Sequence, residues 1–464
     1  MIGDDFSGYL DAVTQYGTQF DVVDPSETRP PGVKVADVRR RRGRLTDSRE
    51  TGVQNLALVE REGVLLWLPA EDVGSPRYGG LRRRARRRGL AGLEVGRVVK
   101  EVSVPVLEPN QYLSALADTD QRLNAQCDAG LRTVKVAPDG QSFAATTEGL
   151  KASYSKRTLL IVHGTFSSSA NILGELAATP KGRAFMHDAL KAYGGQVLVF
   201  DHPTLSVSPF LNALDLGRRL AGTTGSLDVI AHSRGGLVTQ WWLEVFGDAL
   251  AGAQVRAVLA GAPLRGTHLA SPARIQPFLS VLSNIGHYVG QTLNLAASAN
   301  PFALASLALL RFLGQRERNR WGLPPIDGIG SRPGTDAAVA VIPGLQGQSA
   351  VGNNAELMRL RASTARANVR YYACVADFEP ERIGWKLWKV ISEFGDRAKD
   401  VATDAIFKGA NDLVVDTAHM TTLADGRDIT DVTQFLGQAV VHHCNYFRQN
   451  ETLKSLRDWF KPLT

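Results

Sequence analysis

The sequence predicts an α/β domain built on a mainly parallel sheet, with a smaller mixed or β-rich domain before it. From about residue 150 onward, short apolar runs alternate with helical segments, which is typical of a parallel sheet covered by helices on both faces. The preceding residues are rich in arginine and alternate only in part. A chain of 464 residues has room for two or three domains. We therefore predict an accessory domain over residues 1–130 and the main domain over residues 131–464.

The accessory domain is expected to contain strands and one helical stretch. Residues 55–69 resemble two short strands joined at Glu62-Gly63, and residues 95–107 alternate in part like a third strand. Residues 112–125 have helical character. No catalytic spacing is evident in this region.

Five apolar runs are the expected strands of the main sheet, at residues 159–162, 196–200, 227–231, 255–260 and 369–375. After the fourth run the alternation of apolar runs and helical segments stops, and helical stretches rich in leucine and alanine follow. We expect a helical lid at about residues 271–325, because an insertion at this point would leave the strands uninterrupted.

Composition indicates a soluble globular protein and excludes several classes. Cys127, Cys374 and Cys444 are too far apart for a disulfide framework or a metal-ligand spacing. The N-terminus has no basic start followed by an apolar run, and no apolar stretch of about 18 residues exists. We expect a cytoplasmic protein, with secretion by a signal-independent route left open.

The formal net charge of +7 is concentrated in two arginine clusters, Arg39–Arg44 and Arg82–Arg88. Such clusters could contact phosphates of a membrane surface or another polyanion. We favour solvated loops, because no aromatic residues interleave with the arginines. No nucleic-acid-binding motif accompanies them, so a nucleic-acid partner is not expected. The sequence gives no prediction of oligomeric state.

The strongest local motif is AHSRGG at residues 231–236, which follows an apolar strand and opens a helical segment. This strand–turn–helix context is that of a nucleophile elbow centred on Ser233. The positions two residues away must be small, and they are Ala231 and Gly235. The turn would expose the serine hydroxyl and aim the Arg234 amide at an oxyanion. The Arg234 side chain is expected to meet solvent or an acidic partner.

A second oxyanion donor is expected in the loop after the first strand, at His163-Gly164-Thr165-Phe166. The Thr165 amide is our candidate, with the Phe166 amide as the alternative. His163 is expected to fix this loop. We also predict substrate contacts for Phe166 and for His232 beside the nucleophile.

These motifs together resemble bacterial lipases and esterases of the α/β-hydrolase superfamily. The HG pair follows an apolar strand, the AHSxG motif comes seventy residues later, and GAP and RGT segments at residues 261–267 follow the next strand. The resemblance covers roughly residues 155–464. It implies an α/β-hydrolase fold with a catalytic triad in the chain order Ser, Asp or Glu, His.

The resemblance selects an acid and a base. Asp412 stands before a short apolar stretch, as the acid does in lipases, although Leu413 replaces the usual glycine. Asp416 is the rival, and Asp377 and Glu379 also follow a strand. His443 begins an H-x-N-Y-F segment like the base segment of lipase relatives, whereas His442 and His419 are the other histidines after Asp412.

The expected function is hydrolysis of carboxylic esters of hydrophobic or lipid substrates through an acyl-enzyme, without a cofactor or a metal. Three other interpretations stay open. The same triad could perform acyl transfer, thioesterase or amidase chemistry, or the protein could be a lipid-targeting toxin or defence effector. It could also be a binding module that has lost its chemistry. Leucine-rich helices and Trp241-Trp242 suggest an apolar pocket, but we favour core packing for the tryptophans.

Overall fold

The structure is a computed structural model. It describes residues 21–23, 53–61, 64–69, 97–105, 114, 116–118, 120–121, 129–250, 252–267, 270, 342–350, 354–363, 366–377, 412, 414–436 and 441–460. The chain divides into two compact units. The first comprises Met1–Tyr112, Pro272–Ala338 and Lys386–Arg397, and the second comprises Leu113–Ser271, Val339–Trp385 and Ala398–Thr464. The boundary expected at residue 130 stays a prediction.

The first unit contains a four-stranded antiparallel sheet in the order β1-β4-β2-β3. Its strands are β1 (Asp21–Val23), β2 (Val53–Arg61), β3 (Val64–Pro69) and β4 (Arg97–Pro105). The predicted hairpin over residues 55–69 and the predicted strand over residues 95–107 are therefore confirmed. Trp67 and Leu58, on neighbouring strands of the hairpin, are buried.

The second unit is built on an eight-stranded sheet in the order β12-β11-β10-β9-β7-β8-β5-β6. Its strands are β5 (Gly130–Val136), β6 (Phe143–Thr146), β7 (Thr158–Val162), β8 (Val197–Asp201), β9 (Leu227–His232), β10 (Val255–Ala260), β11 (Val369–Ala376) and β12 (Val432–Phe435). The six strands β7 to β12 are parallel, and β5 and β6 form an antiparallel edge. All five predicted strands are present, because unbroken apolar runs are what a sheet buried on both faces requires.

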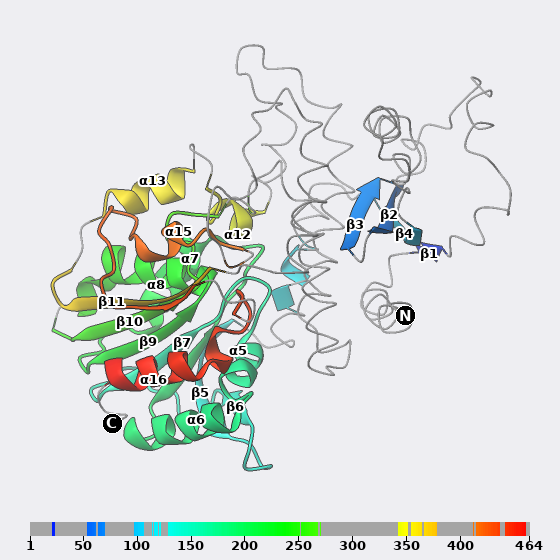
Figure 1. The fold of residues 1–464 in the computed structure, drawn as a ribbon. Coiled ribbons are helices and arrows are strands. Elements are labelled where there is room, and N and C mark those ends of the chain that lie inside the picture. The colour runs from blue at the N-terminus through cyan, green and yellow to red at the C-terminus, as the bar shows by residue number, and fades with distance from the viewer. Residues whose placement is uncertain are drawn as a thin grey trace, which may run out of the picture. The chain divides into compact units, whose positions relative to one another are not determined.

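Helices cover both faces of this sheet, and each face has its own apolar core (Figure 1). One face packs against α7 (Pro209–Arg219), α8 (Arg234–Val245) and α13 (Ala355–Arg361). The other face packs against α5 (Ser169–Leu176), α6 (Pro180–Ala192) and α16 (Asn450–Trp459). Trp241 and Trp242 lie in the first core, as we favoured. Short elements complete the second unit, namely η1 (Gly247–Leu250), α12 (Pro343–Gln346), α15 (Ala418–Thr421) and η4 (Tyr446–Arg448).

The arrangement is the α/β-hydrolase fold, a mainly parallel sheet with a sharp turn between its central strand β9 and the helix α8. In parallel sheets, ligands bind at the edge formed by the carboxyl ends of the strands. The loops after β7, β8, β9 and β10 all leave the sheet at this edge. The chain therefore brings together there the segments that carry the predicted site residues.

The lid expected at residues 271–325 and both arginine clusters lie outside the described residues. In the part of the chain that the structure describes, no helix is long and apolar enough to cross a membrane.

Candidate active site

Ser233 lies on the turn between β9 and α8 with φ 54° and ψ −127°. A positive φ is rare for a residue with a side chain, and such strain persists only where the surrounding structure enforces it. Here the Ser233 amide donates to the Ala260 carbonyl at 2.8 Å, and the Gly236 amide donates to the Ser233 carbonyl at 2.8 Å. The turn therefore holds the serine at the start of α8.

The turn needs small neighbours for measurable reasons. A Cβ at Gly235 would lie 2.6 Å from the carbonyl oxygens of Val162 and His163, and one at Gly236 would overlap the side chain of Ala262. A Cβ at Gly164 would lie 2.8 Å from the Ser233 Cβ, so the loop after β7 can approach the serine only with glycine there. The predicted requirement for a small residue at position 235 is confirmed.

His443 contacts the Ser233 hydroxyl. Its Nε2 lies 2.8 Å from Ser233 Oγ, and its Nδ1 lies 2.7 Å from Asp412 Oδ2. Nδ1 therefore donates to the carboxylate, which leaves Nε2 as the acceptor for the hydroxyl proton. All three residues are at most 6% exposed, so water competes little for these hydrogen bonds.

Asp412 is fully buried, and four donors surround its carboxylate. Oδ1 accepts from the Val414 and Val415 amides at 3.1 and 2.8 Å. Oδ2 accepts from His443 and, at 2.8 Å, from the hydroxyl of Tyr446. Burial alone would raise the pKa of Asp412, but His443 and these donors outweigh burial, and the pKa is lowered. The group is therefore a carboxylate at neutral pH.

The rival acids and bases have other partners in the structure. Asp416 Oδ2 lies 3.8 Å from Nδ1 of His419, on the same short stretch. His442 accepts from the Cys444 amide at 3.2 Å, and burial lowers its pKa to about 4. The Asp377 amide donates to the Phe435 carbonyl. Glu379 lies outside the described residues.

The expected oxyanion donors lie on either side of the serine. Arg234 is the first residue of α8, where a backbone amide has no acceptor within the helix. The Thr165 amide makes no hydrogen bond among the described residues. The Phe166 amide donates to Thr204 Oγ1 at 3.3 Å, so this alternative donor already has an acceptor.

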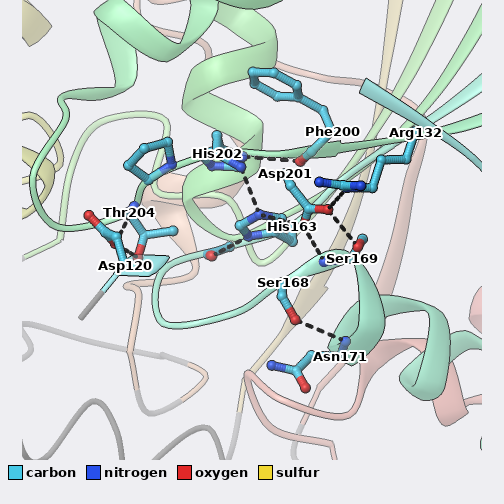
Figure 2. Close-up of polar contacts among 12 residues, drawn as sticks. Asp120, Arg132, His163, Ser168, Ser169, Asn171, Phe200, Asp201, His202 and Thr204 are labelled. Carbon is cyan, nitrogen blue, oxygen red and sulfur yellow. Dashed lines mark hydrogen bonds and ion pairs between the residues drawn. The ribbon is translucent and has the colours of Figure 1, made fainter. Parts of the chain in front are cut away.

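A histidine fixes the loop that carries Thr165 (Figure 2). His163 Nδ1 donates to the Gly164 carbonyl at 2.9 Å, and its Nε2 accepts from the His202 amide at 3.3 Å. Because N–H and C=O of one peptide point in opposite directions, the Thr165 N–H is directed away from His163. Burial lowers the pKa of His163, so the ring stays neutral and keeps this pattern. The expectation that His163 fixes the loop is confirmed.

Of the remaining predicted residues, Phe166 and Arg234 are buried and His232 is half-buried. The His232 Nε2 donates to the His443 carbonyl at 2.7 Å, and burial lowers the pKa of His232 to about 3. Phe166 is 5% exposed and has φ 56°. Their substrate contacts stay a prediction. The Arg234 side chain is fully buried instead of facing solvent, with Nη2 donating to the Val207 carbonyl at 2.6 Å.

Two residues that complete the site lie in sequence segments noted above, but no role was predicted for either of them. Tyr446 donates to Asp412, and Gly261 has φ 58° after β10. A Cβ at Gly261 would lie 2.7 Å from the Tyr446 ring and 3.2 Å from Nδ1 of His443. A glycine at this position is thus what lets the acid and base loops meet. In the described residues, no cluster of three or more His, Cys, Asp or Glu side chains could hold a metal.

A family model described as "Domain of unknown function (DUF7379)" matches residues 131–461. The chain belongs to the DUF7379 family. The matched region contains Ser233, His443 and Asp412, so the residues that meet in the site all belong to the DUF7379 domain. A comparison with curated proteins gave no match.

Solved structures with a similar fold include three bacterial proteins. Lipase 1 from Pelosinus fermentans is 14% identical, with a TM-score of 0.38, over 65% of this chain and 97% of that one. A Bacillus licheniformis lipase in its mature form is 17% identical, with a TM-score of 0.32, over 67% and 93%. A thermophilic esterase from Thermogutta terrifontis is 12% identical, with a TM-score of 0.30, over 73% and 99%. These values are low, so the functional proposal rests on the residues of this DUF7379 protein itself.

Proposed function

We propose that this protein is a serine hydrolase that cleaves carboxylic esters of hydrophobic or lipid substrates, with Ser233 as nucleophile, His443 as base and Asp412 as acid. One observation carries the proposal. The hydroxyl of a serine with a strained backbone, at the start of a helix, donates to a histidine that itself donates to a buried carboxylate. This arrangement of nucleophile, base and orienting acid is recognised by its geometry, whatever the fold.

The first half of the reaction forms an acyl-enzyme. Ser233 Oγ attacks the ester carbonyl carbon while His443 Nε2 takes the hydroxyl proton. The carbonyl oxygen becomes an oxyanion, which the Thr165 and Arg234 amides would stabilise together with the positive end of the α8 dipole. When the oxyanion reforms a carbonyl, the bond to the alkoxy oxygen breaks. His443 then gives its proton to the leaving alcohol.

The second half hydrolyses the acyl-enzyme. His443 takes a proton from water, and the water oxygen attacks the acyl carbon. As this second oxyanion collapses, the bond to Ser233 Oγ breaks and the serine recovers its proton. Asp412 stays ionised throughout, because it holds the Nδ1–H tautomer and stabilises the imidazolium ion. Each group in this scheme comes from the second unit of the chain.

Labelling with a fluorophosphonate probe tests the proposal directly. We expect the wild-type protein to be labelled and Ser233→Ala to be unlabelled at the same concentration, since only an activated serine reacts. Ser169→Ala is the matched control, because that buried serine bonds to Asp201 and lies outside the triad. Assays with p-nitrophenyl esters of short and long acyl chains, with a thioester and an amide beside them, then define the substrate class. Absence of labelling in folded protein, with and without detergent, would refute an activated Ser233.

A further inference from the structure

The loop after β8, residues 203–207, contacts both halves of the expected oxyanion hole. On one side, Thr204 Oγ1 accepts from the Phe166 amide at 3.3 Å, in the loop that carries Thr165. On the other side, the Val207 carbonyl accepts from Nη2 of Arg234 at 2.6 Å. The position of this loop therefore affects both donors at once.

Asp120 holds this loop with an unusual number of hydrogen bonds. Its carboxylate accepts from three consecutive backbone amides, those of Thr204 at 2.7 Å, Leu205 at 3.0 Å and Ser206 at 2.8 Å. It also accepts from the hydroxyls of Ser206 at 2.6 Å and Thr204 at 3.2 Å. Asp120 is 3% exposed, and hydrogen bonds to a buried charged group are the strong ones.

The Thr204 hydroxyl links Asp120 to the Phe166 amide through two hydrogen bonds of fixed direction. It donates its one proton to Asp120 and thereby turns a lone pair to the Phe166 amide (Figure 2 shows Asp120 and Thr204 in contact beside the His163 loop). Phe166 has φ 56°, which is strained for a non-glycine residue. Without an acceptor for its amide, the strained Phe166 would lose one of the contacts that hold it in this conformation.

Asp120 also lies near the buried Arg234 guanidinium. Burial lowers the pKa of Arg234 to about 10, and the charges of Asp120 and Glu356 act in the opposite direction. Arg234 Nε and Nη1 have no hydrogen-bond partner in the described part of the chain. The negative charge of Asp120 therefore compensates a buried cation on the elbow helix as well as anchoring the loop.

We propose that Asp120 is a positioning residue for the oxyanion hole, acting through Thr204 on the Phe166 amide and the loop that carries Thr165. The inference rests on the proposed serine hydrolase function. It extends the catalytic unit beyond the DUF7379 match, because Asp120 precedes residue 131, where the match begins. The segment of the second unit that precedes the match would then be part of the enzyme's machinery.

Kinetics of full-length variants on p-nitrophenyl butyrate test this inference. We expect Asp120→Asn and Thr204→Val to lower kcat by about 10- to 100-fold with KM changed by less than about threefold, because only oxyanion stabilisation is impaired. Thr204→Ser keeps the hydroxyl and should retain kcat within about threefold of wild type. The pH at which kcat/KM is half-maximal should stay that of the wild type, because the triad is untouched.

Asp228→Asn is the matched control. Asp228 is a fully buried carboxylate bonded by Arg157, Arg256 and Tyr193, but it lies at the opposite end of β9 from Ser233. This variant should lose thermal stability and keep kcat. If Asp120→Asn does not fold, the Thr204→Val and Thr204→Ser pair decides the question alone.

The outcomes separate the two proposals. If Thr204→Val retains wild-type kcat, or if Thr204→Ser is as impaired as Thr204→Val, the positioning role is wrong while the hydrolase function stands. If the wild-type protein neither hydrolyses esters nor reacts with a fluorophosphonate, the hydrolase function fails and the positioning role falls with it.

Discussion

Tyr446 and His443 donate to the same oxygen of Asp412, from one side each. The tyrosine hydroxyl thus shares the buried negative charge with the histidine and fixes the direction of the carboxylate. Loss of the tyrosine hydroxyl would leave Asp412 Oδ2 with a single hydrogen-bond donor in the protein interior. This is unfavourable for a charged group.

We therefore expect Tyr446→Phe to lower the free energy of unfolding by about 1–3 kcal/mol. It should also lower kcat. This loss should be much smaller than that expected for Asp412→Asn, about 10³- to 10⁴-fold, because Asp412→Asn removes the charge that sets the tautomer of His443. Urea unfolding and ester kinetics measure the two effects. Tyr193→Phe is the matched control, because it removes a tyrosine–carboxylate bond to Asp228, away from the site, and should leave kcat unchanged. An unchanged kcat in Tyr446→Phe would show that Tyr446 does not orient Asp412.

The sequence located the three residues that meet in the site but not those that support them. Ser233 was predictable because the turn imposes small neighbours at fixed spacing. Asp412 and His443 were predictable only by resemblance, and Asp416 and His442 could not be set aside without the distances. Asp120 bonds to residues more than eighty positions away. No local pattern encodes such a pairing, because the fold alone brings the two segments together.

At the scale of elements, an ion pair joins α5 to the segment η4 that follows the base loop. Arg448 Nε lies 3.3 Å from Glu175 Oε1. Burial is the largest effect on Glu175 and raises its pKa to about 7, although Arg448 acts to lower it. The folded protein therefore binds a proton at Glu175 that the unfolded chain, with an ordinary glutamate pKa near 4.5, has already released at pH 6.

The sign of the pH effect follows from this difference. Between pH about 4.5 and 7 the folded state holds more protons at Glu175 than the unfolded state, so this group's contribution to stability is lost as the pH rises. We expect Glu175→Gln to be stabilised relative to wild type at pH 8, with the gap closing towards pH 5. Thermal unfolding across this range measures the difference, and Glu451→Gln, an exposed change at the start of α16, is the control. A gap that does not vary with pH would contradict the raised pKa.

The strands were the most predictable elements. A parallel sheet with helices on both faces needs strands that are apolar on both sides, and such strands appear in the sequence as unbroken apolar runs. Leu159 to Val162 are fully buried. Their unbroken apolar run predicts this burial even though it does not show which strands or helices pack against them. The order of the strands was not predictable in this way. The antiparallel edge formed by β5 and β6 depends on which strand pairs with β8, and apolar runs carry no such information.

At the scale of the whole molecule, the sheet gathers polar groups from distant segments into one buried edge. Several of these are histidines held neutral by their surroundings. Burial lowers the pKa of His232 to about 3 and that of His442 to about 4. It also lowers the pKa of His163 and His202. Among the described residues, these histidines therefore make the edge that forms the candidate site sensitive to acid.

The buried histidines predict acid destabilisation in a defined window. In the unfolded chain they take up protons near pH 6.5, but in the folded state His442 does so only near pH 4. The unfolded state therefore binds more protons in between, and the stability that neutral His442 provides is lost as the pH falls from about 6.5 to about 4. For one such histidine the loss is up to about 3 kcal/mol, at about 1.4 kcal/mol per pKa unit. Glu175 acts in the opposite direction over part of this range, so only a comparison between variants isolates the effect.

His442→Gln makes that comparison. A glutamine can still accept from the Cys444 amide, as His442 does, but it does not titrate. We expect the free energy of unfolding of this variant to fall less steeply than that of wild type between pH 6.5 and 4, as measured by urea unfolding at several pH values. His187→Gln, which removes an exposed histidine from α6, is the control. Parallel slopes for wild type and His442→Gln would mean that His442 is protonated in the folded protein as readily as in the unfolded chain. His442 would then not be one of the histidines that the edge of the sheet holds neutral.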